Sequence, residues 1–402
     1  MSAPSSHEHR KTVMVVYGTR PEAIKMAPVV RELRSSPHLD VFVAVTGQHR
    51  AMLDQVNSLF GIVPDADLDV IKPRQTLAEI TQRVVMGITD LLQRHRPDAV
   101  LVQGDTTTTF AAALAAFYEK VPVVHLEAGL RTQNRYDPFP EELNRRMTSQ
   151  LASLHLAPTD TSRANLIHDG IAATDIVVTG NTVIDALLDV VRRHLPLENP
   201  ALQEMVLGDS VLVTTHRRES WGEPMSRTAS AVARLAKEFE DIRFVVPAHL
   251  NPVVREVLLP PLQGLKNVLI TEPLCYSDFA RAMFSSKLIL TDSGGVQEEA
   301  PSLGKPVLVL RDTTERPEAV EAGTVKLVGT DEQLIVDETR QLLTDASAYY
   351  EMAHATNPYG DGHAAVRACH ALEWMFGLSD RPSDWVVHRH VASSQVASAQ
   401  VA

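Results

Sequence analysis

The sequence predicts an α/β protein made of two doubly wound domains whose parallel sheets face a central cleft. Short β-branched runs alternate with helix-length amphipathic segments, first in TVMVVY, DVFVAV, DAVLVQ, VPVVHL and DIVVT. A second series follows in SVLVTT, IRFVVP, NVLIT, KLILT, KPVLVL and TVKLVG. The segment LENPALQEMVLGDS indicates a connector before the second series, and we expect the two domains to join near residues 182–200. A chain of 402 residues is long enough for two cores.

The composition excludes several classes of function. A formal net charge of −12 argues against a nucleic-acid surface, because neutralising phosphates requires concentrated Lys and Arg. Cys275 and Cys369 lie far apart without metal-ligand spacing, which favours a reducing compartment. The N-terminus lacks the apolar core of a signal peptide, and the longest apolar run, FAAALAAF, is too short to span a bilayer. We expect a cytoplasmic protein with no membrane role and no metal.

The first strand of the N-terminal series ends in GTRPEAIKMAP. We expect Gly18 to allow a tight turn and Pro21 to lie in the first turn of a helix. Arg20 and Lys25 add two cations near the start of that helix, where backbone N–H groups are free. The pattern indicates an anion site, although an ordinary strand-to-helix turn with surface charges would show the same residues.

Two acidic residues follow neighbouring strands of this series. Asp105 comes after VLVQG, and Glu127 comes after VPVVHL and before Gly129. Because the carboxyl ends of parallel strands meet at one edge, the two carboxylates are expected to lie together, as proton transfer requires. Asp105 has an alternative role, since the residue before a threonine run often caps the following helix.

A densely charged stretch, HLEAGLRTQNRYDPFPEELNRR, covers residues 125–146. It is interrupted by glycine and proline, which argues against a core helix. Glu141 follows PFP and is expected at or near a helix start, where the helix dipole favours an ionised carboxylate. Arg145 lies one turn further along.

The second series carries its own polar strand ends. His216 follows SVLVTT beside Arg217 and Arg218, and His249 follows another strand. A single histidine in such a position is more often structural than catalytic, but the two arginines place His216 in a field that attracts anions.

The strongest local signal is LILTDSGGVQEEAPSLGKPVLVL. Ser293, Gly294 and Gly295 follow a strand and open a helix, an arrangement that directs free N–H groups at a phosphate. Glu299 lies one turn further on, where it can accept hydrogen bonds from ribose hydroxyls. Arg316 follows the next strand, and a plain glycine-rich turn is the alternative interpretation.

No cofactor motif is present where one is needed. The dinucleotide fingerprint G-x-G-x-x-G should follow the first strand, but that place holds GTRPEA. The nearest match, GDGHAA at residues 360–365, does not follow a strand. The Walker A and H-E-x-x-H patterns are absent from the sequence. We therefore expect no NAD, no other cofactor and no metal.

Taken together, the motifs closely resemble the non-hydrolysing UDP-N-acetylglucosamine (UDP-GlcNAc) 2-epimerases. The resemblance covers about residues 12–376, in the order GTRPEAIKMAP, TGQHR, QGDTTTT, HLEAGLRT, PFPEELNRR, TTHRRE, DSGGVQEEA, TTERPE and NPYGDG. It implies a glycosyltransferase-B-like fold of two Rossmann-like domains, commonly dimeric, that interconverts UDP-GlcNAc and UDP-N-acetylmannosamine (UDP-ManNAc). It also implies that a helix near residues 363–376 crosses back to the first domain.

The resemblance implies specific roles for the residues singled out above. Departure of UDP from C1 makes the C2 proton removable by a carboxylate, so the site needs carboxylates near the ring and strong binding of the diphosphate. The implied acid/base groups are Asp105, Glu127 and Glu141, with His216 contacting the diphosphate. The implied substrate contacts are Arg20, Lys25, Arg145, Phe279 (the uracil wall), Ser293, Gly294, Gly295, Glu299 and Arg316.

Bacterial members of the family bind a second, activating UDP-GlcNAc. The matching positions here are Gln48, Arg74, Glu141, Arg217 and His249. The sequence departs from the family pattern at Ala51, where a polar residue is common, and in HRRES in place of HRREN. Loss of one polar contact typically costs about 0.5–1.5 kcal/mol, so we expect a weakened effector site.

Two other classes of protein share part of this pattern. A glycosyltransferase of the same fold would use the same UDP loop but would not need three convergent carboxylates. A sugar-nucleotide sensor would keep the loop and could dispense with Asp105 and Glu127. An epimerase for a 3-acetamido-substituted UDP-sugar also fits.

The resemblance and the strand pattern together suggest domain boundaries. We expect disordered tails at residues 1–11 and 386–402, an N-terminal domain at 12–182 plus 367–385, and a UDP-binding domain at 183–366. The expected partners are UDP-sugars, UDP and a second copy of the chain in a homodimer, with no nucleic acid and no membrane.

Overall fold

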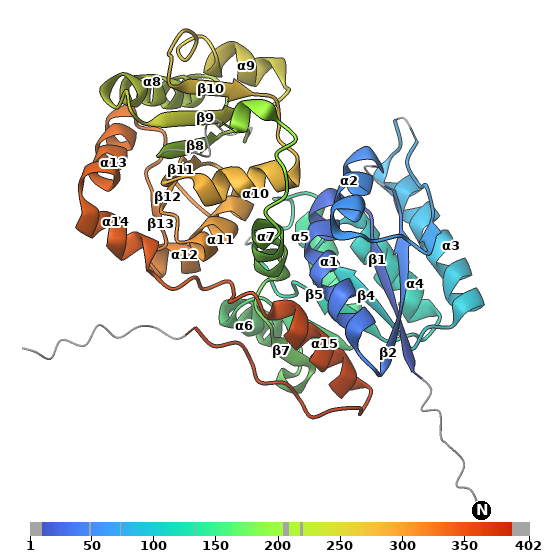
Figure 1. Ribbon diagram of the computed structural model, residues 1–402. Helices are drawn as coiled ribbons and strands as arrows, with labels where there is room; N and C mark the ends of the chain where they lie inside the picture. Colours follow the sequence, from blue (N-terminus) through green and yellow to red (C-terminus); the bar gives the residue numbers. More distant parts are fainter. Residues whose placement is uncertain are drawn as a thin grey trace, which may run out of the picture.

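The structure is a computed structural model that describes residues 10–387, except residues 48, 49, 73, 133, 204–208 and 218–219 (Figure 1). The predicted tails therefore lie largely outside the described residues. Lys11, placed in the N-terminal tail by the sequence analysis, is the first residue of strand β1. No helix in the described part of the chain is long and apolar enough to cross a membrane.

The first domain contains a parallel sheet in the order β3-β2-β1-β4-β5-β6-β7. Its strands are β1 (Lys11–Tyr17), β2 (Leu39–Val45), β3 (Ala66–Asp67), β4 (Ala99–Gln103), β5 (Val123–Leu126), β6 (Leu154–Ala157) and β7 (Ile176–Val178). The strand order reverses between β1 and β4, the place where open α/β sheets bind ligands. Strands β3 and β6 were not expected from the sequence, because they are short and carry few β-branched residues.

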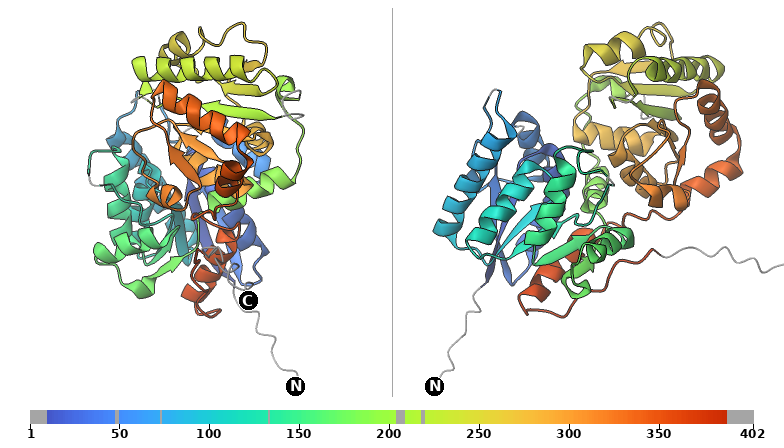
Figure 2. Two further views of the ribbon diagram at one scale, coloured as in Figure 1. Left: turned by 90° about the vertical axis from the view of Figure 1, so that its left-hand side faces the viewer. Right: turned by 180° about the vertical axis from the view of Figure 1, so that it is seen from behind.

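Helices cover both faces of this sheet (Figures 1 and 2). One face carries α1 and α2, and the other carries α3, α4 and α5, which pack in that order. The helices are α1 (Arg20–Ser35), α2 (Arg50–Phe60), α3 (Leu77–His95), α4 (Thr107–Tyr118), α5 (Glu141–Leu151) and α6 (Asp160–His168).

The second domain contains a parallel sheet in the order β10-β9-β8-β11-β12-β13. Its strands are β8 (Ser210–Thr214), β9 (Arg243–Pro247), β10 (Val268–Thr271), β11 (Leu288–Thr291), β12 (Val307–Val309) and β13 (Val325–Leu327). Its helices are α8 (Glu223–Glu238), α9 (Pro252–Leu258), α10 (Tyr276–Ser285), α11 (Gly294–Glu299), α12 (Pro317–Glu321), α13 (Glu332–Thr344) and α14 (Ala346–Ala353). The two sheets confirm the predicted fold class.

Two helices tie the domains together. Helix α7 (Thr182–Arg192) packs on α1 of the first domain and on α10 and α11 of the second. Helix α15 (Ala364–Met375) follows the second domain in sequence but packs on α1 and α7 (Figure 1). Asp185 of α7 accepts hydrogen bonds from the backbone N–H groups of Ala364 and Ala365, at 3.2 and 2.9 Å. One apolar core consequently extends from the first sheet through α7 into α10.

Candidate active site

The turn after β1 is held by a buried glutamate. Glu22 accepts hydrogen bonds from the N–H groups of Gly18 and Thr19, at 3.0 and 2.7 Å, and from the Thr106 hydroxyl at 2.7 Å. Thr19 and Glu22 form the capping box of α1, which places Arg20 and Lys25 in its first two turns. Gly18 is needed for close packing, not for a left-handed turn, because a Cβ there would lie 2.0 Å from the Thr46 hydroxyl.

Asp105 does not cap helix α4. That cap is Thr106, whose hydroxyl accepts the N–H of Thr109 at 3.1 Å. The Asp105 carboxylate instead forms an ion pair with Arg145 at 2.8 Å. Burial raises the pKa of Asp105 to about 6, although the Arg145 charge opposes the shift. A carboxyl group that titrates near neutral pH is suited to give and take protons.

Glu127 is the most constrained of the carboxylates. Its φ of 61° lies in the left-handed region, which a residue with a side chain rarely adopts. Lys25 contacts both carboxylate oxygens, at 2.5 and 2.6 Å, and the Gln103 amide donates to Oε2. Burial lowers the pKa of Lys25, but the negative charges of Glu127 and Glu298 have the larger effect, so that the pKa is raised overall. Because such backbone strain gathers at functional sites, the geometry supports an active role for Glu127.

The charged stretch at 125–146 divides into two groups of side chains. Glu142 is fully buried and holds the loop by accepting from the Thr132 N–H at 3.0 Å and from Arg146 at 2.6 Å. Arg131 likewise forms an ion pair with Asp169, at 2.7 Å. These residues are structural. The second group is Glu127, Glu141 and Arg145, of which Glu141 is the first residue of α5 and lies near enough to Asp105 to influence its pKa.

In the second domain, His216 is oriented by an aspartate that the sequence analysis did not single out. The Nδ1 atom of His216 lies 3.2 Å from the Asp292 carboxylate. The same carboxylate accepts the N–H groups of His216 and Arg217, at 2.8 and 2.9 Å. Burial alone would raise the pKa of Asp292. The contacts with His216 and Arg217 outweigh burial and lower this pKa. An ionised, buried Asp292 leaves Nε2 of His216 as the nitrogen available to a ligand.

The effector residues expected from the family pattern are only partly placed. The rings of His216 and His249 stack with their centroids 6.1 Å apart, and with Arg217 they line a cavity of about 370 Å³. Arg74 is exposed in the loop before α3 and has a φ of 61°. Gln48 lies outside the described residues.

Ser293 is the N-cap of α11, and Gly294 and Gly295 form the start of that helix soon after β11, as the sequence predicts. Glu299 ends α11, is buried, and accepts a hydrogen bond from the Tyr276 hydroxyl at 3.1 Å. Burial raises the pKa of Glu299 to about 7. Tyr276 and Arg20 line a cavity of about 370 Å³ between α2 and α10. Phe279, the expected uracil wall, lies in α10 and is partly buried against the core.

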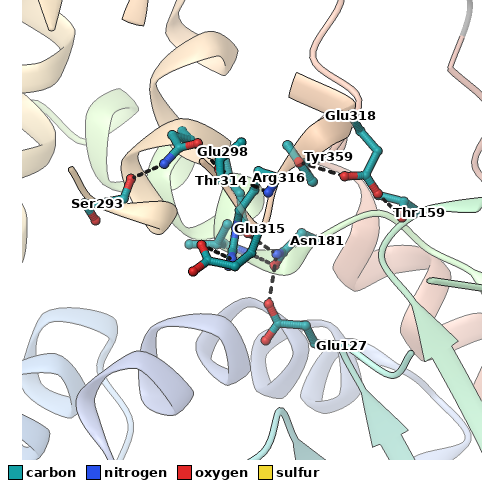
Figure 3. Close-up of polar contacts among 12 residues, drawn as sticks. Glu127, Thr159, Asn181, Ser293, Glu298, Thr314, Glu315, Arg316, Glu318 and Tyr359 are labelled. Atoms are coloured by element: carbon teal, nitrogen blue, oxygen red, sulfur yellow. Dashed lines mark hydrogen bonds and ion pairs between the residues drawn. The ribbon is translucent and has the colours of Figure 1, made fainter. Parts of the chain in front are cut away.

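Polar residues connect the two domains (Figure 3). Arg316 of the second domain forms an ion pair with Glu298 at 2.7 Å. The Asn181 side-chain amide donates to Glu298 at 2.8 Å and to Glu127 at 3.2 Å. Asn181 and Glu298 were not expected from the sequence, where one resembles an ordinary helix cap and the other an ordinary helical acid.

Comparisons with known proteins identify the relatives of this chain. The sequence model described as UDP-N-acetylglucosamine 2-epimerase matches residues 31–373. UDP-N-acetylglucosamine 2-epimerase of Bacillus subtilis is 54% identical over 372 residues, covering 92% of this chain and 97% of the relative. The Escherichia coli K12 enzyme of that name is 53% identical over 370 residues, covering 90% and 98%.

Solved structures agree in fold. A putative UDP-N-acetylglucosamine 2-epimerase from Listeria monocytogenes has a TM-score of 0.89 and 48% identity, covering 94% of this chain and all of the other. UDP-GlcNAc 2-epimerase from Neisseria meningitidis, solved with UDP-GlcNAc bound, has a TM-score of 0.80 and 50% identity, covering 90% and 99%. Because the match extends over most of the chain in every comparison, this protein belongs to the UDP-N-acetylglucosamine 2-epimerase family.

Proposed function

We propose that the protein interconverts UDP-GlcNAc and UDP-ManNAc by epimerisation at C2, without a nicotinamide cofactor or a metal. The observation that carries the proposal is that Glu127, which follows the strand beside that of Asp105, and Glu141 at the start of α5 both lie close enough to Asp105 to raise its pKa. Across the cleft, the second domain presents a glycine loop, His216 and Arg316. Carboxylates near a sugar ring and an anion site for its leaving group are what an elimination requires.

The proposed reaction has two half-steps. In the first, the C1–O bond breaks and its electron pair leaves with the β-phosphate of UDP. A carboxylate takes the C2 proton, and the C2–H electron pair becomes the C1=C2 double bond of a 2-acetamidoglucal. In the second, a proton is delivered to C2 from the opposite face while the phosphate oxygen attacks C1. No net oxidation occurs, so no redox cofactor is required.

The side chains of the site divide these tasks. Asp105, Glu127 and Glu141 move protons, and Arg145 holds Asp105 in place. His216, Arg20 and Lys25 stabilise charge on the departing diphosphate. The substrate contacts proposed in the second domain are Phe279, Ser293, Gly294, Gly295, Glu299 and Arg316. We further propose that residues 12–182 plus 367–385 and residues 183–366 move as two bodies that close over the substrate and exclude water.

Proton NMR of the purified protein with UDP-GlcNAc in D₂O tests the proposal. Deuterium is expected at C2 of the accumulating UDP-ManNAc, because the base exchanges its proton with solvent between half-steps. EDTA should leave the rate unchanged. Release of free sugar with stoichiometric UDP, or exchange only after an acceptor is added, would favour hydrolysis or glycosyl transfer. Turnover confined to 3-acetamido-substituted UDP-sugars would redefine the substrate.

We also propose that the active form is a cytoplasmic homodimer. Met86 of α3 and Phe117 and Tyr118 of α4 are more than half exposed on neighbouring helices. Exposed apolar side chains on neighbouring helices favour burial against a second copy. Light scattering after size exclusion should give twice the chain mass, and Phe117→Glu should shift the equilibrium toward monomer. A wild-type monomer at micromolar concentration would contradict the proposal.

We propose, finally, that a second UDP-GlcNAc binds weakly beside the active site through Glu141, Arg217 and His249, with Gln48 and Arg74. The cavity lined by Arg217 and His249 beside His216 supports this effector site. Substrate-velocity curves should therefore be sigmoidal only at low UDP-GlcNAc. His249→Ala should remove the sigmoidal part and leave the maximal rate nearly intact.

A further inference from the structure

Asn181 uses every polar atom of its side chain. Its Oδ1 caps helix α7 by accepting the N–H of Val183 at 3.1 Å. Its Nδ2 donates to Glu127 Oε1 at 3.2 Å and to Glu298 Oε2 at 2.8 Å (Figure 3). The side chain is only 3% exposed. Because the cap requires an oxygen, it fixes the orientation of the amide and directs the NH₂ group toward the two carboxylates.

Capping alone does not explain why this residue is asparagine. Aspartate, serine and threonine cap helices about as well, since a cap needs only an acceptor. The feature that asparagine adds is the pair of amide hydrogens. Glu127 comes from the first domain and Glu298 from the second, so the amide lies between two carboxylates that would otherwise repel each other. An aspartate in this place would add a third carboxylate to the same buried volume.

Each of these carboxylates also has a cation of its own domain. Lys25 contacts Glu127 at 2.5 Å, and Arg316 contacts Glu298 at 2.7 Å. The amide of Asn181 therefore joins two ion pairs into one continuous row across the cleft. The first pair contains a proposed proton acceptor, and the second contains a proposed contact of the nucleotide.

We propose that Asn181 is a positioning residue for the epimerisation, which orients the Glu127 carboxylate and links it to the Glu298–Arg316 pair of the nucleotide-binding domain. This inference rests on the proposed function. Asn181 holds one Glu127 oxygen in place while the Gln103 amide holds the other. The direction from which Glu127 approaches C2 is thereby set by both domains, and a shift of Glu298 when the nucleotide binds is transmitted to it.

The test compares Asn181→Asp with wild type in the D₂O exchange experiment and in UDP calorimetry. Asn181→Asp keeps the cap oxygen and the shape but removes both donors. We expect C2 exchange at pH 8 to fall about 100-fold, as for loss of an active-site donor, with the affinity for UDP within about threefold of wild type. Relative to wild type at the same pH, exchange should recover partly below pH 6, because the protonated carboxyl group regains one donor.

Two further variants separate a positioning role from a structural one. Asn267→Asp removes amide donors to the backbone carbonyls of Ala236, Phe239 and Ile242, away from the cleft, so it should lower stability and leave exchange unchanged. Asn181→Asp with Glu298→Gln restores a donor between positions 181 and 298 only. We expect this pair to recover thermal stability without recovering exchange, because the contact with Glu127 is still lost.

Three results would overturn the inference. Normal exchange by Asn181→Asp at pH 8 would show that the donors are dispensable. Parallel loss of exchange, UDP affinity and folding would reduce Asn181 to a helix cap. Recovery of exchange by the double variant would show that Asn181 matters only through its contact with residue 298 and not through its contact with Glu127. Absence of C2 exchange in wild type, with UDP still bound, would instead refute the proposed function itself.

Discussion

Gly294 lies directly against the guanidinium group of Arg316: a Cβ on Gly294 would stand 3.2 Å from Arg316 Cζ. The arginine has little freedom to move away, because it is fixed by Glu298. We therefore expect Gly294→Ala to displace Arg316 and to weaken UDP binding, while the overpacking itself lowers stability by roughly 1–3 kcal/mol. Calorimetric titration with UDP measures the loss.

Gly295→Ala is the comparison for this variant. Its new methyl group would meet only Glu299 Oε2 and Ser293 Oγ, at 3.7 and 3.9 Å, which are ordinary contacts. We expect a smaller loss of affinity than with Gly294→Ala. Equal losses would mean that crowding around Ser293–Gly295, and not displacement of Arg316, is responsible.

The Asp105–Arg145 ion pair predicts a pH dependence of catalysis. With a pKa of about 6, Asp105 is ionised above that pH and protonated below it. If the ion-paired form is the active one, kcat/KM for epimerisation should fall as the pH drops through about 6. Arg145→Met removes the charge that lowers this pKa, so the midpoint should move to higher pH by about one unit. Arg145→Lys should leave the midpoint near 6, and an identical midpoint in all three proteins would exclude Asp105 as the titrating group.

Glu299 should couple nucleotide binding to a proton. Its pKa of about 7 means that it is largely protonated at pH 6 in the free protein. Ribose hydroxyls donate hydrogen bonds best to the ionised form, so UDP affinity should increase as the pH rises through 7, with release of a proton on binding. Calorimetry in buffers of different ionisation enthalpy measures that release. Because UDP also titrates near this pH, Glu299→Gln serves as the reference, and equal proton release by both proteins would contradict the coupling.

Asp185 should make the protein less stable as the pH rises. Burial raises the pKa of Asp185 to about 6, although the carboxylate accepts hydrogen bonds from two backbone N–H groups, which lower its pKa. Between about pH 4 and 6, Asp185 is protonated in the folded state but largely ionised in the unfolded state. Its contribution to the free energy of unfolding is therefore present at low pH and is lost as the pH rises through 6. The shift corresponds to about 3 kcal/mol.

Denaturant unfolding at pH 4 and pH 8 checks this expectation. Asn cannot ionise, so Asp185→Asn should be slightly less stable than wild type at pH 4, because one weakened hydrogen bond costs about 1 kcal/mol, and should be the more stable protein at pH 8. A stability difference between variant and wild type that does not change with pH would show that Asp185 stays ionised throughout.

Site residues that lie within a local sequence motif could be predicted better than residues whose contacts join segments far apart in the sequence. Strand ends could be recognised from β-branched runs, so the loops bearing Asp105, Glu127 and the Ser293 turn were identified in advance. Asp292 follows a strand just as Asp105 does, so its position at a strand end was sufficient to mark it as a candidate site residue. Asn181 and Glu298 gave no such signal, because their partners lie 54 to 117 residues away in sequence. The two short strands β3 and β6 are defined by pairing with neighbours and not by their own composition.

The two passages of the chain between the domains touch each other. The N–H of Asn181 donates to the Tyr359 carbonyl at 2.7 Å, and a Cβ on Gly180 would stand 3.4 Å from the Cα of Gly360. Two domains joined by one segment of chain can bend and twist about every axis. Two connecting segments that are held side by side restrict the domains to rotation about one hinge axis. If the domains close over a substrate as proposed, the double connection favours a single rotation, and each closure should bring the carboxylates and Ser293–Gly295 back to the same alignment.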